Sequence, residues 1–527
     1  MLKIRIPLLW RYILLIWLIA TIFNLHKAYH IDDAFHLEAA AHIVKNPLRP
    51  MSGFINWDDV PKPMYQHNQP PLLFYIISLN QYLFGTSEIA MHFMMSIFTF
   101  FSLYYFFKLI NLLNLHYKRE LLFLFGFCPA FIINQNLMTD IPVLSIMLAM
   151  YYHLLKGLIL ESVKHYFIAS LYISIGLLIK YSLLPFVLIL FLTILFSRHF
   201  KNIFVVFTPV LILGLWSLWN KYEFGSIHIL SRPKIIFQYK LIFDYLGTLG
   251  SMTLFSFLYA HSSFFRNKKS SLITLIFLMS IYCVIYFHFL KVVTLEYFLS
   301  VLFVTNGIFL LFILCYRSIQ LIIKDKIQFL SSPSFVLMLG ICGVSLFIIL
   351  FAPFNATRHI LIILPLILLF GHLNFDLISG KLRIIAIMIN MILGILLAIS
   401  DWDYADFYRD TAKKINIRND TYWSFGHWGW KWYSRKAGMK IYSTTDQSKL
   451  KVGDFIMYPV YVPKQAFPNG LELDTVKTFV HQPSIFTYFA VSNARFYNSS
   501  VRKPSWTLSG EPYDIIYQFR IRRITKP

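Results

Sequence analysis

The chain has 527 residues, of which 57% are hydrophobic, 18% aromatic and only 14% charged, and its mean hydropathy is +0.60. Soluble globular proteins carry about 25% charged residues, so this composition excludes an ordinary soluble enzyme, a disordered chain and a disulfide-rich scaffold. The net charge of +23 comes mainly from short basic clusters between apolar runs. Retention of lysine and arginine on the cytoplasmic side explains such clusters better than nucleic-acid binding, so we predict a membrane protein with no nucleic-acid partner.

Apolar runs long enough to cross a membrane recur from Leu8 to Ser400. The first run follows Lys3 and Arg5 and has no small-residue cleavage site after it, so we predict a transmembrane helix whose N-terminal end is cytoplasmic. Basic clusters then fall at alternate loops, which predicts roughly thirteen spans over residues 1–400. An odd number of spans places the residues after Ser400 on the external face.

Two segments are too polar to insert into a membrane. Residues 26–71 form the first external loop, and a helix is predicted from about Asp32 to Lys45. Residues 401–527 lack long apolar runs; their short alternating stretches predict strands, and residues 404–417 predict a helix. The predicted fold class is therefore a polytopic α-helical membrane protein with an external α/β or β-rich soluble domain at residues 401–527.

Adjacent carboxylates, Asp32 and Asp33, open the first external loop directly after a span. One interpretation is helix capping, because an aspartate at the N-cap accepts hydrogen bonds from free backbone N–H groups. Capping explains one aspartate well and two less well. The other interpretation is a general base at the membrane surface, since a carboxylate in a half-dry cleft can take a proton from an attacking hydroxyl.

Further polar and charged residues are predicted at external ends of spans. The loop ends with His67, Asn68 and Gln69, followed by a double proline. These three residues place several hydrogen-bonding groups close to the predicted membrane surface. An ionisable residue inside or beside a span is costly and is a functional hypothesis by default. For lysine and arginine the alternative is that the side chain reaches up to the interface. The ionisable residues in question are Asp140, Lys180 in the next segment, and Arg358 with His359 later in the chain. The polar residue Asn136 lies in the same segment as Asp140.

Four of these elements occur in an order that resembles a known family. They are Asp32-Asp33-Ala34, His67-Asn68-Gln69-Pro70-Pro71-Leu72, Leu137-Met138-Thr139-Asp140-Ile141-Pro142, and Arg358-His359 followed by Pro365. Together they resemble the GT-C glycosyltransferases, and most closely the bacterial branch of the protein O-mannosyltransferase and lipid A aminoarabinose transferase family. The second carboxylate is usually glutamate in that family and is an aspartate here.

The resemblance implies transfer of a sugar from a polyprenyl-phosphate carrier to an acceptor on the external face, with inversion at the anomeric carbon. It implies that Asp32 is the general base, and that Asp33 and Asp140 orient the acceptor or bind a divalent cation. His67 and Asn136 would join Asp140 in binding the acceptor. Lys180, Arg358 and His359 would bind the donor phosphate, where positive charge stabilises the developing negative charge. No metal ligand set is recognised in the sequence, so metal dependence stays open.

Two other functions are open from the sequence. A multispan transporter or flippase for lipid-linked sugars would place charges near the bilayer midplane and often shows two related halves, neither of which is seen. A non-catalytic scaffold would leave the carboxylates without purpose. The acceptor could be a lipid, a protein or a cell-envelope glycan. The composition, rich in Ile, Phe, Lys, Asn and Tyr, favours a bacterial inner membrane with the C-terminal domain in the periplasm.

Overall fold

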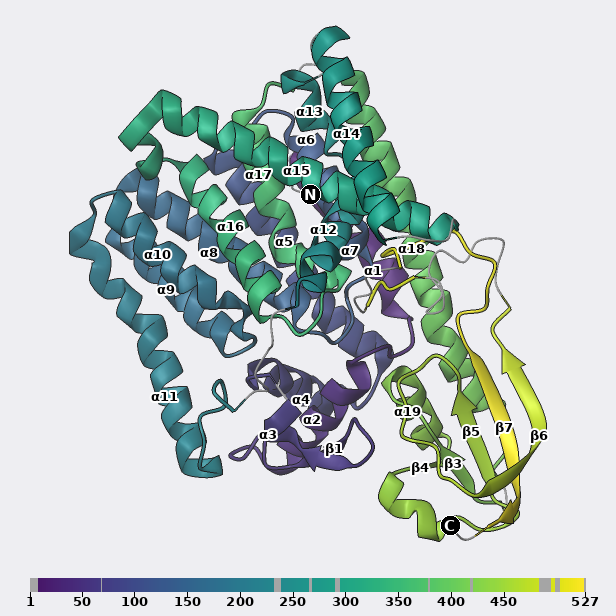
Figure 1. Cartoon of the computed structure of the whole chain (residues 1–527). Helices are drawn as coiled ribbons and strands as arrows, with labels where there is room; N and C mark the ends of the chain where they lie inside the picture. The colour runs from purple at the N-terminus through teal and green to yellow at the C-terminus, as the bar shows by residue number, and fades with distance from the viewer. Residues whose placement is uncertain are drawn as a thin grey trace, which may run out of the picture.

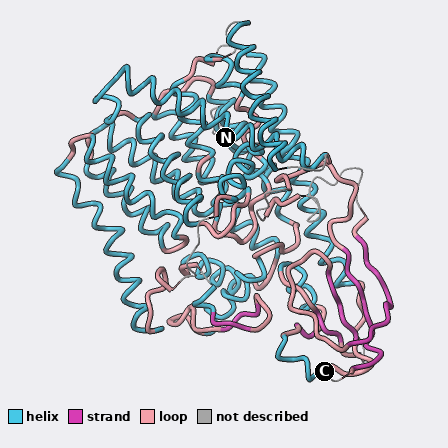
Figure 2. The backbone as a smooth tube through the Cα atoms, in the orientation of Figure 1, coloured by secondary structure: helices cyan, strands magenta, loops and turns pink. Residues whose placement is uncertain are grey.

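The computed structural model describes residues 8–67, 69–231, 238–264, 268–289, 294–377, 380–417, 420–482, 494–497 and 503–525. Among these residues helices dominate, and strands are confined to a short hairpin and to the C-terminal region (Figures 1 and 2). The α-helices are α1 Leu8–Leu25, α2 Asp33–Lys45, α3 Met64–His67, α4 Leu72–Phe84, α5 Glu88–Leu112, α6 Lys118–Gly126, α7 Pro129–Ile132, α8 Asp140–Leu160, α9 Val163–Leu177, α10 Leu184–Phe196, α11 Phe207–Phe224, α12 Lys240–Met252, α13 Phe257–Ser263, α14 Lys268–Phe289, α15 Leu295–Asp325, α16 Pro333–Phe351, α17 Leu364–Asn374, α18 Gly380–Lys413 and α19 Trp428–Lys436. Short 3-10 helices are η1 Tyr181–Leu183, η2 Phe200–Val206, η3 Lys326–Ser331, η4 Thr357–Ile362 and η5 Thr444–Lys449.

Most long helices gather in one bundle, and their composition identifies it as the membrane part (Figure 1). Within the described residues, eight helical segments are long and apolar enough to cross a membrane: Leu8–Leu25, Glu88–Leu112, Asp140–Leu160, Phe200–Phe224, Leu295–Ser331, Pro333–Phe351, Thr357–Asn374 and Gly380–Lys413. Four shorter apolar helices accompany them: Leu72–Phe84, Val163–Leu177, Tyr181–Phe196 and Ser271–Tyr286. The chain is therefore a multi-pass helical membrane protein, as predicted. The figure of roughly thirteen spans stays a prediction.

Close packing of α12 against α15 depends on two glycines. A Cβ on Gly250 would overlap the carbonyl oxygen of Phe303, and a Cβ on Gly307 would overlap that of Leu246. The two backbones can approach this closely only because neither position carries a side chain, as is common between membrane helices.

We expect Gly307→Ala to lower the free energy of unfolding by about 1–3 kcal/mol, since overpacking forces backbone shifts. The measurement is a denaturant titration of the purified protein in mixed micelles. The matched control is Gly214→Ala in α11, where a Cβ would meet no atom within 4 Å. Equal stability of the two variants would contradict the packing argument.

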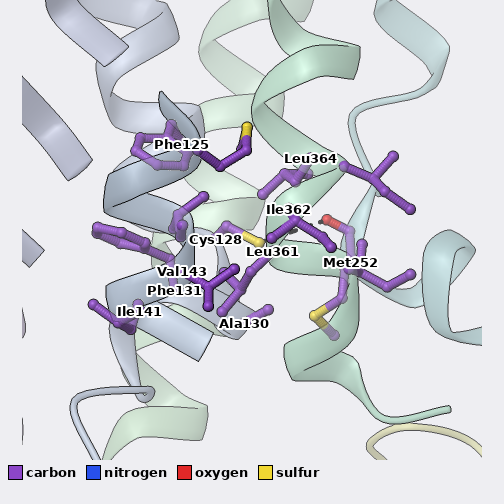
Figure 3. Packing of buried hydrophobic residues seen from close by; sticks show 14 of the residues in the cluster. Phe125, Cys128, Ala130, Phe131, Ile141, Val143, Met252, Leu361, Ile362 and Leu364 are labelled. Carbon is purple, nitrogen blue, oxygen red and sulfur yellow. Dashed lines mark hydrogen bonds between the residues drawn. The ribbon is translucent and has the colours of Figure 1, made fainter. Parts of the chain in front are cut away.

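At one end of the helix bundle, short helices rather than long ones contribute side chains to the hydrophobic core. Figure 3 shows Cys128 and Phe131 of the α6–α7 segment packed against Leu361 of η4 and beside Met252 of α12. These side chains are buried, and the Cys128 Sγ lies 3.9 Å from the Met252 carbonyl oxygen. This packing fixes η4 against α7 and thereby sets the position of the loop that follows α7.

Residues 26–71, the loop after α1, form a small layer at one end of the bundle. Strands β1 (Phe54–Asn56) and β2 (Pro61–Pro63) pair antiparallel, and α2 packs on α4 through Phe74 and its neighbours (Figure 1). Pro71 occupies the N-cap of α4, as its fixed φ favours. The backbone N–H of Leu72 donates to the Leu178 carbonyl oxygen at 3.1 Å, which ties this layer to the end of α9.

The C-terminal region is a five-stranded sheet with one helix beside it. The strands are β3 Tyr422–Ser424, β4 Lys440–Ile441, β5 Phe455–Pro459, β6 Leu471–Val480 and β7 Ile515–Ile524, in the spatial order β4-β3-β5-β7-β6. β3 is parallel to β4 and β5, whereas β7 is antiparallel to β5 and β6. This mixed α/β arrangement confirms the predicted fold class. α18 runs without a break through position 400, so the proposed boundary between residues 400 and 401 lies inside a helix.

The sheet domain contacts the loop of residues 26–71 through α19. Lys431 is buried, and its Nζ lies 2.9 Å from Oε2 of Glu38 in α2. Nη1 of Arg435 lies 2.8 Å from the other oxygen of the same carboxylate. A Cβ on Gly429 would overlap the carbonyl oxygen of Tyr29, so the glycine permits α19 to approach the segment just before Asp32. The C-terminal domain therefore supports the segment that carries the adjacent aspartates.

Candidate active site

Four charged side chains from distant parts of the sequence form a line that we call the charge row: Asp32, Arg358, Asp140 and Lys180. Oδ2 of Asp32 lies 3.0 Å from Nη2 of Arg358. Nε of Arg358 lies 3.6 Å from Oδ2 of Asp140, and Oδ1 of Asp140 accepts a hydrogen bond from Lys180 Nζ at 2.7 Å. The row alternates acid and base, so each buried charge has a partner of opposite sign.

The two ends of the charge row are its accessible parts. The Asp32 side chain is 29% exposed and that of Lys180 is 19% exposed, whereas those of Arg358 and Asp140 are 9% and 7% exposed. Nη1 of Arg358 also contacts the sulfur of Met138 at 3.1 Å. The row therefore has an accessible carboxylate at one end and an accessible ammonium group at the other. The buried pair of Arg358 and Asp140 lies between them.

Local backbone geometry directs Asp32 towards Arg358. The preceding residue, Ile31, has a φ of 48°, which turns the chain sharply into α2. Asp32 stands at the N-cap of α2, but its side chain makes no capping hydrogen bond. The capping interpretation therefore does not account for this carboxylate, which pairs with the arginine instead.

Asp33 is enclosed. Its side chain is fully buried, and its two oxygens accept hydrogen bonds from the backbone N–H groups of His30 at 2.7 Å and Leu137 at 2.8 Å. These bonds hold the start of α2 against the loop between α7 and α8. Burial raises the pKa of the Asp33 carboxyl from 3.8 to about 7. This geometry favours a role in positioning the two loops over direct contact with a substrate.

The raised pKa of Asp33 predicts a pH-dependent stability. The unfolded carboxyl ionises at lower pH than the folded one, so its stabilising contribution is complete below about pH 4 and is lost as pH rises towards about 7. We expect the midpoint temperature of thermal unfolding of the wild type to fall from pH 4 to pH 7 relative to that of Asp33→Asn, measured by intrinsic fluorescence. Parallel profiles for the two proteins would contradict the assignment.

The other predicted residues lie beside the charge row or away from it. His359 interacts electrostatically with Lys180, Arg358 and Asp140, and its Nδ1 accepts a hydrogen bond from the Ala356 backbone N–H at 3.3 Å. Asn136 is buried, and its Nδ2 donates to the Tyr497 hydroxyl at 3.4 Å, so it belongs to a neighbouring network. His67 ends α3; its side chain and Asn68 lie outside the described residues.

One residue of the site was missed from the sequence. His36 lies one helical turn after Asp32, and its Nδ1 lies 2.9 Å from the Asp32 carbonyl oxygen. Its ring contacts Phe74 of α4 at a centroid distance of 5.1 Å. Burial lowers the pKa of His36 to about 4, so the ring is neutral at neutral pH. The i, i+4 spacing of Asp32 and His36 in a predicted helix was the signal that could have revealed it.

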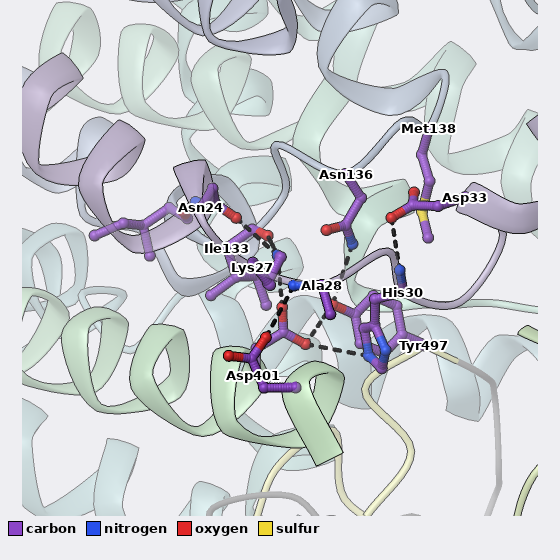
Figure 4. A network of polar contacts seen from close by, with 12 residues as sticks. Asn24, Lys27, Ala28, His30, Asp33, Ile133, Asn136, Met138, Asp401 and Tyr497 are labelled. Carbon is purple, nitrogen blue, oxygen red and sulfur yellow. Dashed lines mark hydrogen bonds and ion pairs between the residues drawn. The ribbon is translucent and has the colours of Figure 1, made fainter. Parts of the chain in front are cut away.

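A second polar network, shown in Figure 4, fixes the segment that leads to Asp32. Nζ of Lys27 lies 2.8 Å from Oδ2 of Asp401 and also donates to Asn24 and to the Ile133 carbonyl oxygen. The Tyr497 hydroxyl donates to Oδ1 of Asp401 at 2.6 Å. The Lys27 and Asp401 side chains are fully buried, so the network anchors the end of α1 to α18 and to residues 494–497.

No group of three or more His, Cys, Asp or Glu side chains within the described residues is arranged to hold a metal ion. The charge row already neutralises each carboxylate with a lysine or arginine, an arrangement that the sequence could not reveal.

Part of the chain is similar in sequence to a known protein family. Residues 68–219 match the family "Dolichyl-phosphate-mannose-protein mannosyltransferase". No curated protein matches the chain in sequence. Among solved structures, the apo oligosaccharyltransferase of Archaeoglobus fulgidus has a TM-score of 0.49 and 11% identity, and the match covers 86% of this chain and 70% of that protein. Against the same protein with zinc and sulfate, this chain spans only 62% of its length, at a TM-score of 0.46 and 11% identity over 82% of this chain.

The apo structure of ArnT from Cupriavidus metallidurans matches with a TM-score of 0.41 and 12% identity, over 85% of this chain and 92% of that protein. Structural likenesses at this distance carry no part of the functional argument. The family match covers Asp140 and Lys180 and leaves Asp32 and Arg358 outside it. The resemblance predicted from the motifs is thus confirmed over residues 68–219, where the chain is similar to the dolichyl-phosphate-mannose-protein mannosyltransferase family.

Proposed function

We propose that this protein is a membrane glycosyltransferase that moves a sugar from a polyprenyl-phosphate carrier to an acceptor on the external face. The observation that carries the proposal is the charge row, in which an accessible carboxylate, Asp32, lies beside a buried arginine and an accessible ammonium group ends the row. The family match over residues 68–219 supports a lipid-phosphate sugar donor. The acceptor would be a lipid, a protein or a cell-envelope glycan.

In the proposed reaction Asp32 takes the proton from the acceptor hydroxyl as its oxygen attacks the anomeric carbon. The bond from that carbon to the phosphate oxygen breaks, and its electron pair leaves with the polyprenyl phosphate. Direct attack inverts the configuration, and the proton on Asp32 then passes to water. Lys180 and Arg358, with His359 beside them, would stabilise the negative charge that grows on the phosphate.

Asp33 and Asn136 would hold the loops in place. Asp140 would orient the side chains of Lys180 and Arg358. The donor keeps its lipid tail in the bilayer, which explains why the charge row lies at the ends of apolar helices such as α8. We place the protein in a bacterial inner membrane, with a cytoplasmic N-terminus and a periplasmic C-terminal domain.

The test is sugar transfer by purified protein in detergent, with a panel of radiolabelled polyprenyl-phosphate sugars and an extract of envelope lipids, proteins and glycans as acceptor. We expect one donor to yield labelled product and free polyprenyl phosphate in equal amounts, with inverted configuration by NMR. If no donor is consumed while labelled lipid-linked sugar crosses the membrane of reconstituted vesicles, the transporter alternative replaces the proposal.

A further inference from the structure

Basic side chains gather at the end of the helix bundle that lies away from the charge row. We call them the basic cluster: Lys108 of α5, His153 and Lys156 of α8, and Lys164 and His165 of α9. α8 begins at Asp140 in the charge row, and at about 1.5 Å per residue Lys156 lies about 24 Å further along the same helix. The basic cluster therefore lies almost a membrane thickness away from the proposed catalytic residues.

Aromatic rings hold the ammonium groups of the basic cluster in place. Nζ of Lys108 lies 5.2 Å from the centroid of the Tyr152 ring, and Nζ of Lys156 lies 5.6 Å from the same centroid. Nδ1 of His153 lies 3.0 Å from Nδ1 of His165, which joins α8 to α9. Contact with the same ring brings the two lysine ammonium groups close together, although their like charges repel each other.

These positive charges have no carboxylate partner among the residues that the structure describes. A carboxylate oxygen of Glu161, the C-cap residue of α8, lies 3.7 Å from Nε2 of His199 instead. Lys108 and Lys156 are half-buried, whereas basic residues at other predicted cytoplasmic loops, such as Lys201, are exposed. Retention of positive charge on the cytoplasmic side requires only that lysines lie near span ends, so it does not explain half-burial on shared aromatic rings.

Exposed apolar side chains are close in sequence to the residues of the basic cluster in α8 and α9. Ile159 and Leu160 follow Lys156 at the end of α8 and are 46% and 57% exposed. Val163 and Phe167 flank the cluster residues of α9, and both are 43% exposed. An apolar surface next to unpaired ammonium groups matches a ligand with an anionic head and hydrocarbon tails, and not a free inorganic anion.

We propose that the basic cluster is a binding site for the phosphate headgroup of an anionic phospholipid, with its acyl chains against the ends of α8 and α9. Basic pockets between membrane helices on the cytoplasmic side bind such headgroups in other membrane proteins. The lipid would neutralise the unpaired lysines and stabilise the contact between α5, α8 and α9. This site is independent of the proposed glycosyltransferase activity.

The test uses the full chain in a neutral detergent, titrated with phosphatidylglycerol or phosphatidylcholine in mixed micelles. Thermal unfolding by intrinsic fluorescence and retention of lipid by native mass spectrometry are the two readouts. We expect phosphatidylglycerol alone to raise the unfolding midpoint, and the double variant Lys108→Gln/Lys156→Gln to bind it about 30-fold more weakly. The matched control, Lys201→Gln/Lys324→Gln, removes two exposed lysines and should bind as the wild type does.

Three results would overturn the proposal. Equal stabilisation by phosphatidylcholine would exclude recognition of the headgroup, and equal loss of binding in the control variant would reduce the effect to general surface charge. Equal stabilisation by inorganic phosphate would assign the site to a free anion. If the double variant does not fold, Lys164→Gln removes the exposed lysine of the cluster and should weaken phosphatidylglycerol binding about fivefold.

Discussion

Replacing Asp32 by asparagine is expected to lower the rate of sugar transfer by about 10²–10⁴-fold, which is the usual contribution of a general base. Asparagine has nearly the same shape but cannot accept the proton of the acceptor hydroxyl. Arg358 keeps its second carboxylate, Asp140, so the charge row should stay assembled. Initial rates with a labelled donor provide the measurement, and kcat should fall while the KM for the donor changes little, because the donor phosphate is bound elsewhere in the row.

Asp58→Asn is the matched control for that experiment. Asp58 lies in the same loop, residues 26–71, and is 43% exposed, and its carboxylate pairs with Lys62 at 2.7 Å. It therefore resembles Asp32 in being partly exposed and in pairing with a cationic side chain, but it lies outside the charge row. Transfer by Asp32→Asn at more than half the wild-type rate would exclude Asp32 as the base. Asp140 would then be the remaining carboxylate of the row.

The sequence singles out the members of the charge row but does not show how they meet. Asp140, Lys180 and Arg358 stood out because ionisable groups at span ends are costly, and the structure brings them within ion-pair distance. Nothing in the spacing of these residues shows that an arginine more than 200 positions away in the sequence lies between the two aspartates. Such contacts depend on how the helices pack, which a hydropathy pattern does not encode.

The two adjacent aspartates show where local reasoning stops. The sequence allows capping or catalysis for both residues, because neighbours in sequence share the same predicted helix start. In the structure the sharp turn at Ile31 sends Asp32 towards Arg358, while Asp33 accepts hydrogen bonds from two backbone N–H groups. One of those groups belongs to Leu137, so the environment of Asp33 depends on a loop that the sequence could not place beside it.

The limits of hydropathy also appear in the short helices. α4 is apolar and follows a double proline, a pattern typical of a helix that enters the bilayer. With 13 residues it is about 20 Å long, shorter than an apolar layer of about 30 Å, and it packs against α2. α18 shows the opposite case, because its 34 residues extend about 51 Å, well beyond an apolar layer of about 30 Å. The C-terminal part of α18 places Asp401 in the buried network with Lys27 and Tyr497.

Replacing Lys27 by methionine is expected to lower the free energy of unfolding by about 3–5 kcal/mol, because it leaves the buried carboxylate of Asp401 without its cation. The double variant Lys27→Met/Asp401→Leu should be more stable than the single variant, since it leaves no unpaired buried charge. Denaturant titration in mixed micelles provides the measurement. As a control, Lys62→Met breaks an exposed pair and should cost no more than about 1 kcal/mol.

The cost of Lys27→Met should also depend on pH, and the reason lies in His30. This histidine is buried, and burial and the charge of Lys27 lower its pKa to about 4, although its Nε2 lies only 3.5 Å from Oδ1 of Asp401. Without Lys27 the pKa of His30 rises, so at low pH the protonated ring can replace the lost ammonium group as the partner of Asp401. The variant should therefore lose less stability at pH 5 than at pH 8. A cost that is constant across this range would mean that His30 does not replace Lys27 as the partner of Asp401.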